Sequence, residues 1–593
     1  MTDAPRYLIT TADERTWKFD RPVLFLGEWC RLYDRKHVWS KMDAIVAKPY
    51  GINQEQRDKN FRFAREIEEQ LILILKNELN YVHGTKHDVR YWKIVLGHWL
   101  RRYVDVIFNR YHALKQCVCN YKINGISSFF SRKYGLETLN SGDFIYACND
   151  DMWNSVLYGY VFDLLKINKA LKIDKVSISE IAGFRISETA KDGYIKRKLA
   201  LLVHHGIESL TNNLVFKNDA FIINSYLPRV QELRLQLCFG QMPKIWRSPK
   251  LDSLPEPNRN LRQEIERRIL KNDDEDFFHC VKKFIFKTIP VCYLEGFSLL
   301  CKRVKELPWP TSPKFIFTSN NFDTGEIFKI WTALKTETGI PYYAGQHGNN
   351  YGTHQYICNT IEEITSDKFL TWGWKDGLKQ HIPAFIFKTV SRKTRAYNPY
   401  GGLLLIQICL NHKISIWDGY PEFIKYFAEQ QNFIEKLNSP CRKTLTVRLH
   451  AEYRIHGWSE QARWRDFDPD LNIDDGKQSI RKLIQKSRLV IYSYDSTGIL
   501  ETLSQNIPTL AFWQNGLEHL RETAKPYYQL LIDAGIVHLS PESIAQKVNE
   551  VWDDVTAWWD GEEIQKARGQ FCDRYAHVSK QPMRDLMKLL TPS

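Results

Sequence analysis

The last third of the chain alternates short apolar runs with segments of helical spacing, and this alternation constrains the fold more than any other feature. Strands that alternate with helices form βαβ units, which place the strands in a parallel sheet with helices on both faces. Ligands of such sheets bind beyond the carboxyl ends of the strands, so the residues that follow each run are the candidates for function. The apolar runs are residues 403–406, 445–449, 489–492, 509–512 and 536–539.

The chain of 593 residues is long enough to bury more than one core. Before residue 395, strand-like runs occur at residues 7–10, 23–26, 314–318, 340–344 and 368–371, and about 52–305 has mostly helical spacing. Basic, turn-rich sequence at 391–402 marks a linker. We therefore predict an α/β fold with two Rossmann-like domains, residues 1–395 with a large helix-rich elaboration and residues 396–575. A C-terminal helix within 576–593 is predicted to pack back on the first domain.

Composition excludes several classes of protein. The twelve cysteines are scattered without a Cys-x-x-Cys pair, which argues against a zinc or redox centre. No run approaches the roughly 20 apolar residues that span a bilayer. The N-terminus lacks the basic and apolar regions of a signal peptide, so we expect a cytoplasmic protein.

The net charge of +14 leaves several partners open. A basic surface can serve nucleic acid, an anionic membrane face or a negatively charged substrate. Nucleic-acid-binding proteins carry a contiguous basic stripe with interleaved aromatics, and the chain has no strong stripe of this kind. We expect no nucleic-acid partner, and peripheral contact with the inner face of the cytoplasmic membrane stays open.

The strongest candidate site follows the run at 489–492, where a polar turn leads into a helix that begins near Ser496. Free amides at a helix start form an anion site, and neighbouring hydroxyls can add donors. A glycine there lets a phosphate approach the backbone, and a carboxylate one turn into the helix could reach ribose hydroxyls. The alternative is a simple helix cap in which the acidic side chain completes a capping box. The predicted donor-binding residues are Ser493, Asp495, Ser496, Thr497, Gly498 and Glu501.

Two further candidates follow the run at 445–449. Residues two apart on a strand point to the same side, so Arg448 and His450 could face one phosphate together. A lone histidine is often structural, but the end of a strand in the same domain favours a functional role.

A glycine-rich loop follows the run at 340–344. Glycines at 345, 348 and 352 let the backbone turn tightly, and they would hold His347 at the edge of a cleft as a general base. The alternative is a surface turn. The other residues of this predicted cleft loop are Gln346, Gly348, Asn349 and Asn350.

Carboxylates offer weaker catalytic candidates. Glu28 follows the run at 23–26 and Asp323 follows the run at 314–318, so either could be the base instead of His347. Acidic pairs at Asp468-Pro469-Asp470 and Asp150-Asp151 do not closely follow a convincing strand. We therefore predict no metal site.

Four motifs resemble the transferases of O-antigen biosynthesis clusters, and the resemblance runs nearly the full chain. They are Tyr7-Leu8-Ile9-Thr10-Thr11, Phe25-Leu26-Gly27-Glu28-Trp29-Cys30, Gly345-Gln346-His347-Gly348 and Thr371-Trp372-Gly373-Trp374. More distantly, the Gln-His-Gly turn and the Asp-Ser-Thr at a strand end are similar to two groups of GT-B enzymes. These are the CDP-glycerol glycerophosphotransferases and the CMP-ulosonic-acid transferases of capsules, which include Kdo and sialic-acid transferases.

The resemblance implies a GT-B-like fold in which an N-terminal acceptor domain and a C-terminal donor domain face a cleft, with no obligatory metal. It implies that His347 is the base or a leaving-group contact, and that His450, Ser496 and Thr497 hold the donor phosphate. The chain departs from the ulosonic-acid transferases at His450-Ala451, where they usually have His-Pro. This departure puts an ulosonic donor in doubt.

These features predict a metal-independent glycosyltransferase that moves a sugar from a nucleotide-sugar donor to a lipid-linked or growing cell-surface glycan, in O-antigen, lipopolysaccharide or capsule synthesis. No cofactor is expected beyond the nucleotide-sugar co-substrate. One alternative is a CDP-polyol phosphotransferase of surface-polymer synthesis, which would use the same cleft. A second is a non-catalytic basic protein that binds membrane or nucleic acid.

Overall fold

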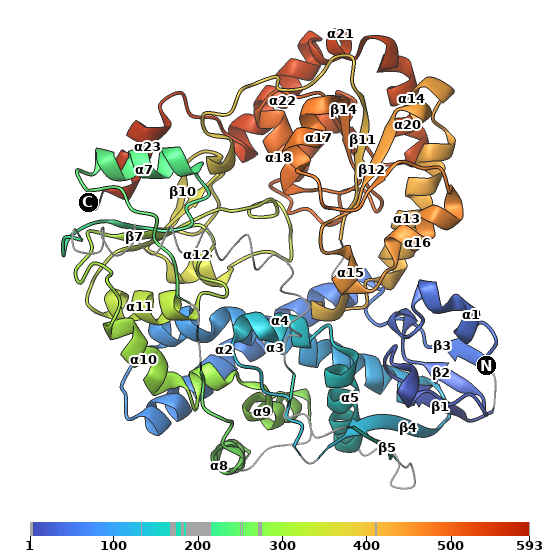
Figure 1. The fold of residues 1–593 in the computed structure, drawn as a ribbon, viewed down its shortest axis with the longest axis vertical. Helices are drawn as coiled ribbons and strands as arrows, with labels where there is room; N and C mark the ends of the chain where they lie inside the picture. The colour runs from blue at the N-terminus through green and yellow to red at the C-terminus, as the bar shows by residue number, and fades with distance from the viewer. Residues whose placement is uncertain are drawn as a thin grey trace.

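Three parallel β-sheets stand at three corners of the computed structural model, with long helices between them (Figure 1). The structure describes residues 4–131, 133–165, 173–178, 183–184, 215–249, 251, 253–270, 276–409 and 412–591. Every strand pair in the three sheets runs parallel. The α/β class with parallel sheets is therefore confirmed.

The first sheet has the strand order β3-β2-β1-β4-β5. Its strands are β1 (Arg6–Ile9), β2 (Val23–Phe25), β3 (Ala44–Val46), β4 (Ile123–Phe130) and β5 (Ile173–Ser177). The chain leaves β3 for a helical hairpin, α2 (Gln54–His83) and α3 (Val89–Asn120), before it returns in β4. α5 (Asp151–Leu165) then packs on β4, and Gly159 permits the close approach because a Cβ there would lie 2.4 Å from Ser128 Oγ.

The second sheet has the strand order β10-β9-β8-β7-β6. Its strands are β6 (Phe221–Ile222), β7 (Ile316–Thr318), β8 (Tyr342–Gly345), β9 (Lys368–Thr371) and β10 (His381–Pro383). The helices around it include α7 (Arg229–Cys238), α10 (Phe297–Lys305), α11 (Glu326–Glu337) and α12 (Ile361–Thr365). The C-terminal helix α23 (Pro582–Leu590) packs beside α7, and its Leu586 and Leu590 are buried in the apolar core of this sheet.

The third sheet has the strand order β13-β12-β11-β14-β15-β16, so the order reverses between β11 and β14. Its strands are β11 (Gly402–Ile406), β12 (Leu445–Arg448), β13 (Ile473–Asp474), β14 (Ser487–Tyr492), β15 (Thr509–Phe512) and β16 (Val537–His538). The helices around it include α13 (Tyr420–Glu435), α17 (Ile480–Lys486), α18 (Thr497–Ser504), α19 (Lys525–Asp533) and α20 (Pro541–Val551).

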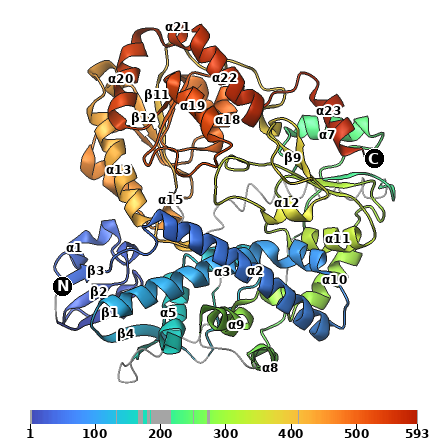
Figure 2. The same ribbon diagram turned by 180° about the vertical axis from the view of Figure 1, so that it is seen from behind.

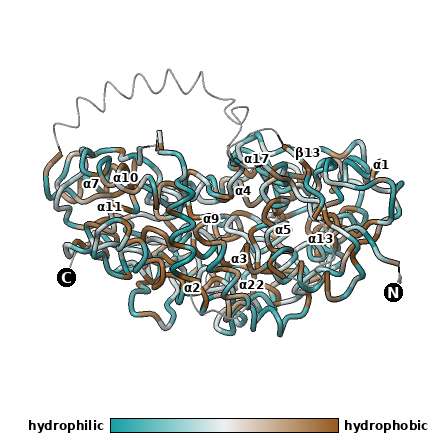
Figure 3. Tube along the Cα trace, turned by 90° about the horizontal axis from the view of Figure 1, so that it is seen from below, coloured by the Kyte–Doolittle hydropathy of each residue, from teal (hydrophilic) through white to brown (hydrophobic). Residues whose placement is uncertain are grey.

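The hairpin of α2 and α3 joins the first two sheets. α3 contacts α5 beside the first sheet and α11 and α12 beside the second, and it lies in the middle of the molecule when seen from below (Figure 3). Seen from behind, α2 and α3 run across the molecule between the two sheets (Figure 2). Asn53 and Asp88 cap the two helix starts, and Gly84 ends α2 at a φ of 63°, a left-handed conformation that favours glycine.

The part of the chain before residue 395 thus contains two sheets, one more than the sequence indicated. The predicted helix-rich segment of about 52–305 supplies β4, β5 and β6 to these sheets, and its residues 185–214 lie outside the described residues. β4 was missed because Asn124, Gly125, Ser127 and Ser128 interrupt its apolar run. Among the helices that the structure describes, none is both long and apolar enough to cross a bilayer.

Candidate active site

The carboxyl ends of the third sheet open into a pocket of about 500 Å³, which we call the basic pocket. Residues that follow β11 and β14 line it, so it lies where the strand order reverses, the usual ligand site of an open α/β sheet. Both halves of the chain contribute, since Lys388 and Arg392 precede residue 395 and Arg481 follows it. The halves therefore face each other across a cleft, as in the GT-B-like arrangement.

The turn from β14 into α18 forms one wall of the basic pocket. Ser496 is the N-cap residue of α18, but its side chain makes no capping hydrogen bond. Its Oγ is buried, with the Tyr494 hydroxyl nearby but outside hydrogen-bonding geometry, and it has no partner among the described residues. A buried hydroxyl without a partner, beside free amides at a helix start, is suited to an anionic ligand.

Glu501, the acidic residue of the alternative capping box, is also engaged elsewhere. The Glu501 carboxylate pairs with Lys388 Nζ at 2.7 Å and with an Arg392 guanidinium nitrogen at 3.1 Å, so it organises the basic wall. A Cβ at Gly498 would lie 2.3 Å from the Tyr492 ring. Glycine is therefore required at this position because the helix starts close against the strand.

The side chains of two residues predicted to bind the donor make hydrogen bonds within the protein instead. Ser493 is fully buried, and its Oγ donates to the Ile406 carbonyl at 2.7 Å and lies 2.7 Å from the Tyr426 hydroxyl. Asp495 accepts hydrogen bonds from Asn349 Nδ2 at 2.7 Å and from the Tyr528 hydroxyl at 2.8 Å. These two side chains hold the turn in place.

Arg448 lines the basic pocket, but its guanidinium is also engaged. It pairs with Asp474 at 2.7 Å and donates to the carbonyls of Gly476 and Gln478. Arg448 therefore holds the loop after β13. His450 stands between the basic pocket and a second pocket of about 480 Å³, and its Nδ1 accepts the Glu452 amide at 3.2 Å. In the neutral ring the proton then lies on Nε2, where it can be donated to a ligand.

The loop after β8 contacts the turn before α18. The amide of Asn349 donates to Thr497 Oγ1 at 2.9 Å, so the predicted cleft loop and the predicted phosphate loop touch directly. Gln346 attaches the loop to the segment that follows β9. Its Oε1 accepts from the Trp372 amide and from Trp374 Nε1, both at 2.8 Å. Gly348 comes close to Thr497, and Asn350 adopts a left-handed φ of 78° and lines the second pocket.

His347 is oriented by a buried chain of polar side chains. Its Nδ1 lies 3.1 Å from the Tyr351 hydroxyl, which donates to Glu362. His98 Nε2 lies 3.5 Å from the same carboxylate. Burial lowers the pKa of His347 below its ordinary value, which keeps the imidazole neutral near pH 7.

His347 lies behind the wall of the cleft. Its ring packs against Tyr226, with ring centroids 5.8 Å apart, and Tyr226 lines a pocket of about 380 Å³ that shares Lys388, Arg392 and Arg481 with the basic pocket. His347 is not among the residues that line the basic pocket itself.

The two carboxylates predicted as alternative bases lie in different places. Asp323 is in the same buried network as His347. Burial alone would raise the Asp323 pKa, but Arg102, which donates to it at 2.7 Å, lowers the pKa below its usual range. Glu28 lies at the carboxyl end of β2 and pairs with Arg31 at 2.9 Å, away from this network.

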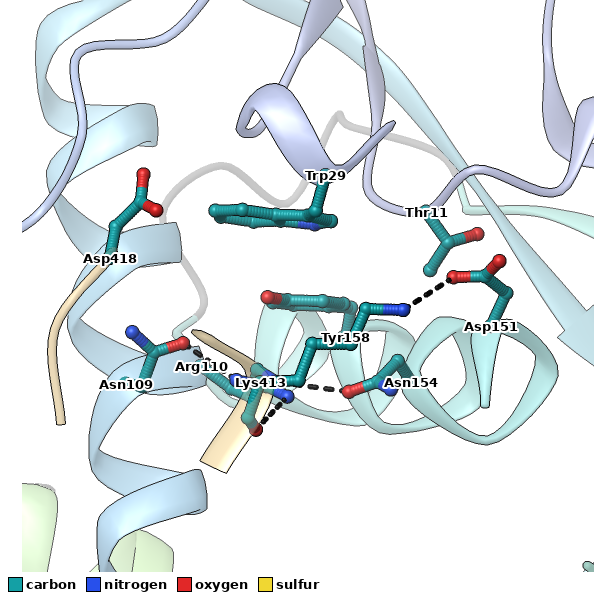
Figure 4. A pocket seen from close by; sticks show the side chains of 9 residues that line it. All are labelled: Thr11, Trp29, Asn109, Arg110, Asp151, Asn154, Tyr158, Lys413 and Asp418. Atoms are coloured by element: carbon teal, nitrogen blue, oxygen red, sulfur yellow. Dashed lines mark hydrogen bonds and ion pairs between the residues drawn. The ribbon is translucent and has the colours of Figure 1, made fainter. Parts of the chain in front are cut away.

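A small pocket beside Glu28 lies between the first sheet and the third (Figure 4). In it the rings of Trp29 and Tyr158 face each other, and Lys413 pairs with Asp151 at 3.4 Å. Burial raises the pKa of Asp418, at its edge, to about 7. Among the residues that the structure describes, no group of three or more His, Cys, Asp or Glu side chains could hold a metal ion.

Sequence reasoning missed several residues of the site. Arg392 was assigned to an interdomain linker because the run at 391–402 is basic and rich in turns, and Lys388, just before that run, was not singled out. Tyr351, Glu362 and His98 carry no local signal that connects them to His347. The basic run could have been recognised as a phosphate-facing segment, since it lies between two predicted domains.

A model of the LIC12162 family of transferases matches residues 6–590. The chain belongs to this family. The match spans both halves of the chain and all three sheets, and the protein is thus a transferase. No curated protein matches the sequence.

Some solved structures have a similar course of the chain over part of this transferase. MurG of Acinetobacter baumannii is 13% identical over 50% of this chain and 77% of its own, with a TM-score of 0.29. S. aureus MnaA with UDP is 10% identical over 78% and 95%, with a TM-score of 0.31. Arabidopsis thaliana UGT89C1 with quercetin is 11% identical over 63% and 99%, with a TM-score of 0.32. At such low identities and TM-scores, the similarity does not indicate a function.

Proposed function

We propose that this transferase is a glycosyltransferase that moves a sugar from a nucleotide-sugar donor to a cell-surface polysaccharide of the O-antigen, lipopolysaccharide or capsule type. The observation that carries the proposal is the buried Ser496 hydroxyl, which lacks a partner and stands at the start of α18 in the basic pocket. Lys388 and Arg392 line the same pocket beside Glu501 and supply positive charge for a diphosphate.

In this proposal the donor phosphates lie between the start of α18 and the basic wall. Ser496 and Thr497 donate hydroxyl hydrogen bonds, and His450 Nε2 approaches the phosphate from the side of β12. Because protein cations neutralise the leaving group, the transfer needs no metal ion. Chelation with EDTA should therefore leave the transfer rate unchanged.

His347 is proposed as the base that takes the proton of the attacking hydroxyl, or as a contact to the leaving group. Its burial supports the first role, since only a neutral imidazole can accept a proton. The hydroxyl of Tyr351 and the carboxylate of Glu362 would then stabilise the imidazolium that forms. The acceptor would be a lipid-linked or growing glycan that reaches the enzyme from the inner face of the cytoplasmic membrane.

A thermal-shift screen of UDP, GDP, CDP, CMP and TDP tests the proposal. Stabilisation by a nucleotide that Ser496→Ala weakens is expected. CMP alone would indicate an ulosonic donor, and CDP alone would indicate a polyol phosphate, which would replace sugar transfer by phosphotransfer in the same pocket. If no nucleotide stabilises the protein at concentrations up to millimolar, the basic pocket does not bind a donor and the proposal is wrong.

A further inference from the structure

The outer face of α7 exposes apolar side chains where a surface helix is normally polar. Leu235 and Gln236 point into the protein, whereas Val230 is 72% exposed and Leu237 is 60% exposed. Residues seven apart lie on one helix face, so these two side chains and the exposed Arg234 between them form a single stripe. Met242 and Ile245, 46% and 45% exposed, continue the apolar character in the segment that follows.

The charged residues around α7 are mostly basic. Residues 215–249 contain five basic and two acidic residues. Both acidic side chains are engaged inside the protein, since Asp219 accepts from the Phe216 amide and Glu232 accepts from Ser225. The neighbouring helix α23 adds Arg584 and Lys588, both exposed. Figures 1 and 2 both show α7 and α23 side by side at the edge of the second sheet.

The exposed apolar side chains of α2 lack this combination. α2 exposes Leu73 and Tyr81, but it contains five basic and six acidic residues, so its surface has no excess of positive charge. An apolar stripe flanked by basic residues is the composition of helices that lie in the interface of an anionic membrane. The charge of an anionic membrane is therefore complementary to the surface of α7 and not to that of α2.

The stripe is also continuous with the proposed active site. Val230 and Gln231 line the pocket of about 380 Å³ whose other wall is Lys388, Arg392 and Arg481. The last three residues also line the basic pocket. A surface seated on α7 would lie at the mouth through which an acceptor could reach the donor.

We propose that the surface formed by α7, the segment 242–247 and the basic face of α23 docks on an anionic lipid bilayer. Val230, Leu237, Met242 and Ile245 enter the interface, while Arg229, Arg234 and Arg247 lie at the level of the lipid phosphates. The inference rests on the proposed function in one respect, because docking there presents a lipid-linked acceptor to the basic pocket. This surface is then the side of the enzyme that faces the membrane.

Co-sedimentation of the full-length protein with lipid vesicles tests this surface. Vesicles of phosphatidylcholine with phosphatidylglycerol should bind the protein, and vesicles of phosphatidylcholine alone should bind it much less. Each basic residue near an anionic membrane contributes about fivefold to partitioning, so reversing one charge and removing one apolar anchor in Arg234→Glu, Leu237→Ser should reduce binding at least about 20-fold. The matched control Arg62→Glu, Leu73→Ser changes an exposed arginine and an exposed leucine of α2, and it should bind as the wild type does.

Nucleotide-induced thermal stabilisation is measured on the same variants. Both should keep it, which shows that they are folded and separates this inference from the donor site. Equal loss of vesicle binding in both variants, or no preference for the anionic vesicles, would overturn the inference while the proposed function stands. Binding of RNA or of a protein that the α7 variant abolishes, without any vesicle binding, would likewise overturn it.

Discussion

Replacing Ser496 by alanine distinguishes a ligand-binding serine from a helix cap, because the two roles predict opposite changes. An N-cap serine that makes its capping bond contributes about 1 kcal/mol to stability. Here no such bond exists, and the residue is only 4% exposed. Removing a buried hydroxyl without a partner relieves a desolvation penalty of about 1–3 kcal/mol. The free energy of unfolding of the unliganded protein should therefore stay the same or rise.

The same substitution should weaken nucleotide binding. A hydrogen bond from a hydroxyl to a charged phosphate contributes about 1.5–3 kcal/mol, which corresponds to an increase in Kd of between about 10-fold and 150-fold. Isothermal titration with the nucleotide that the thermal-shift screen selects measures this change. Chemical denaturation of the unliganded variant measures the stability.

The neighbouring Ser493 provides the matched control, since its hydroxyl donates to Ile406 and contacts Tyr426 in the core. Ser493→Ala should lower the free energy of unfolding by about 1–3 kcal/mol and leave the nucleotide Kd within a few-fold of the wild type. A Ser496→Ala protein that is about 1 kcal/mol less stable, yet binds nucleotide normally, would refute the ligand role and restore the cap interpretation.

Three further predictions follow from the contacts of the site. Tyr351→Phe removes the hydroxyl between His347 and Glu362, so the transfer rate should fall by about 10- to 100-fold, part of what general acid–base catalysis supplies, with nucleotide Kd unchanged. An unchanged rate would remove this contact from the mechanism. Burial raises the pKa of Asp418 to about 7, above its unfolded value, so its contribution to stability is present at low pH and is lost as pH rises through 7. Asp418→Asn should therefore stabilise the protein by on the order of 4 kcal/mol at pH 8 and not at pH 4, and thermal unfolding that shows equal gains at both would contradict it. Asp495→Ala leaves the buried Tyr528 hydroxyl without its acceptor and removes the hydrogen bond from Asn349 of the first half, so the variant should lose on the order of 2 kcal/mol and be cleaved faster in limited proteolysis. Wild-type resistance would show that Asp495 does not hold the two halves together.

The sequence by itself determined five of the six strands of the third sheet, all but the two-residue β13, and the edge at which the basic pocket lies. These five strands are largely apolar runs bounded by turns, and helices follow them at regular intervals, so local periodicity is enough to define both. The polar residues after β14 could be singled out because parallel strands end at one edge of their sheet. This logic placed Ser496, Thr497 and His450 beside the basic pocket, as the structure has them.

The tertiary structure alone decided the rest. Whether a hydroxyl faces a ligand or the core depends on side chains far away in the sequence, and for this reason Ser493 and Ser496, three residues apart, have opposite surroundings. The same holds for β4, which becomes a strand because β1 and β5 pair with it on either side. His347 could be proposed from its loop, but its orientation comes from Glu362 and His98, which only the packing of α12 and α3 against each other brings together. The local sequence pattern indicates which secondary structure a segment can form. The packing of distant segments against each other determines which groups each polar side chain contacts.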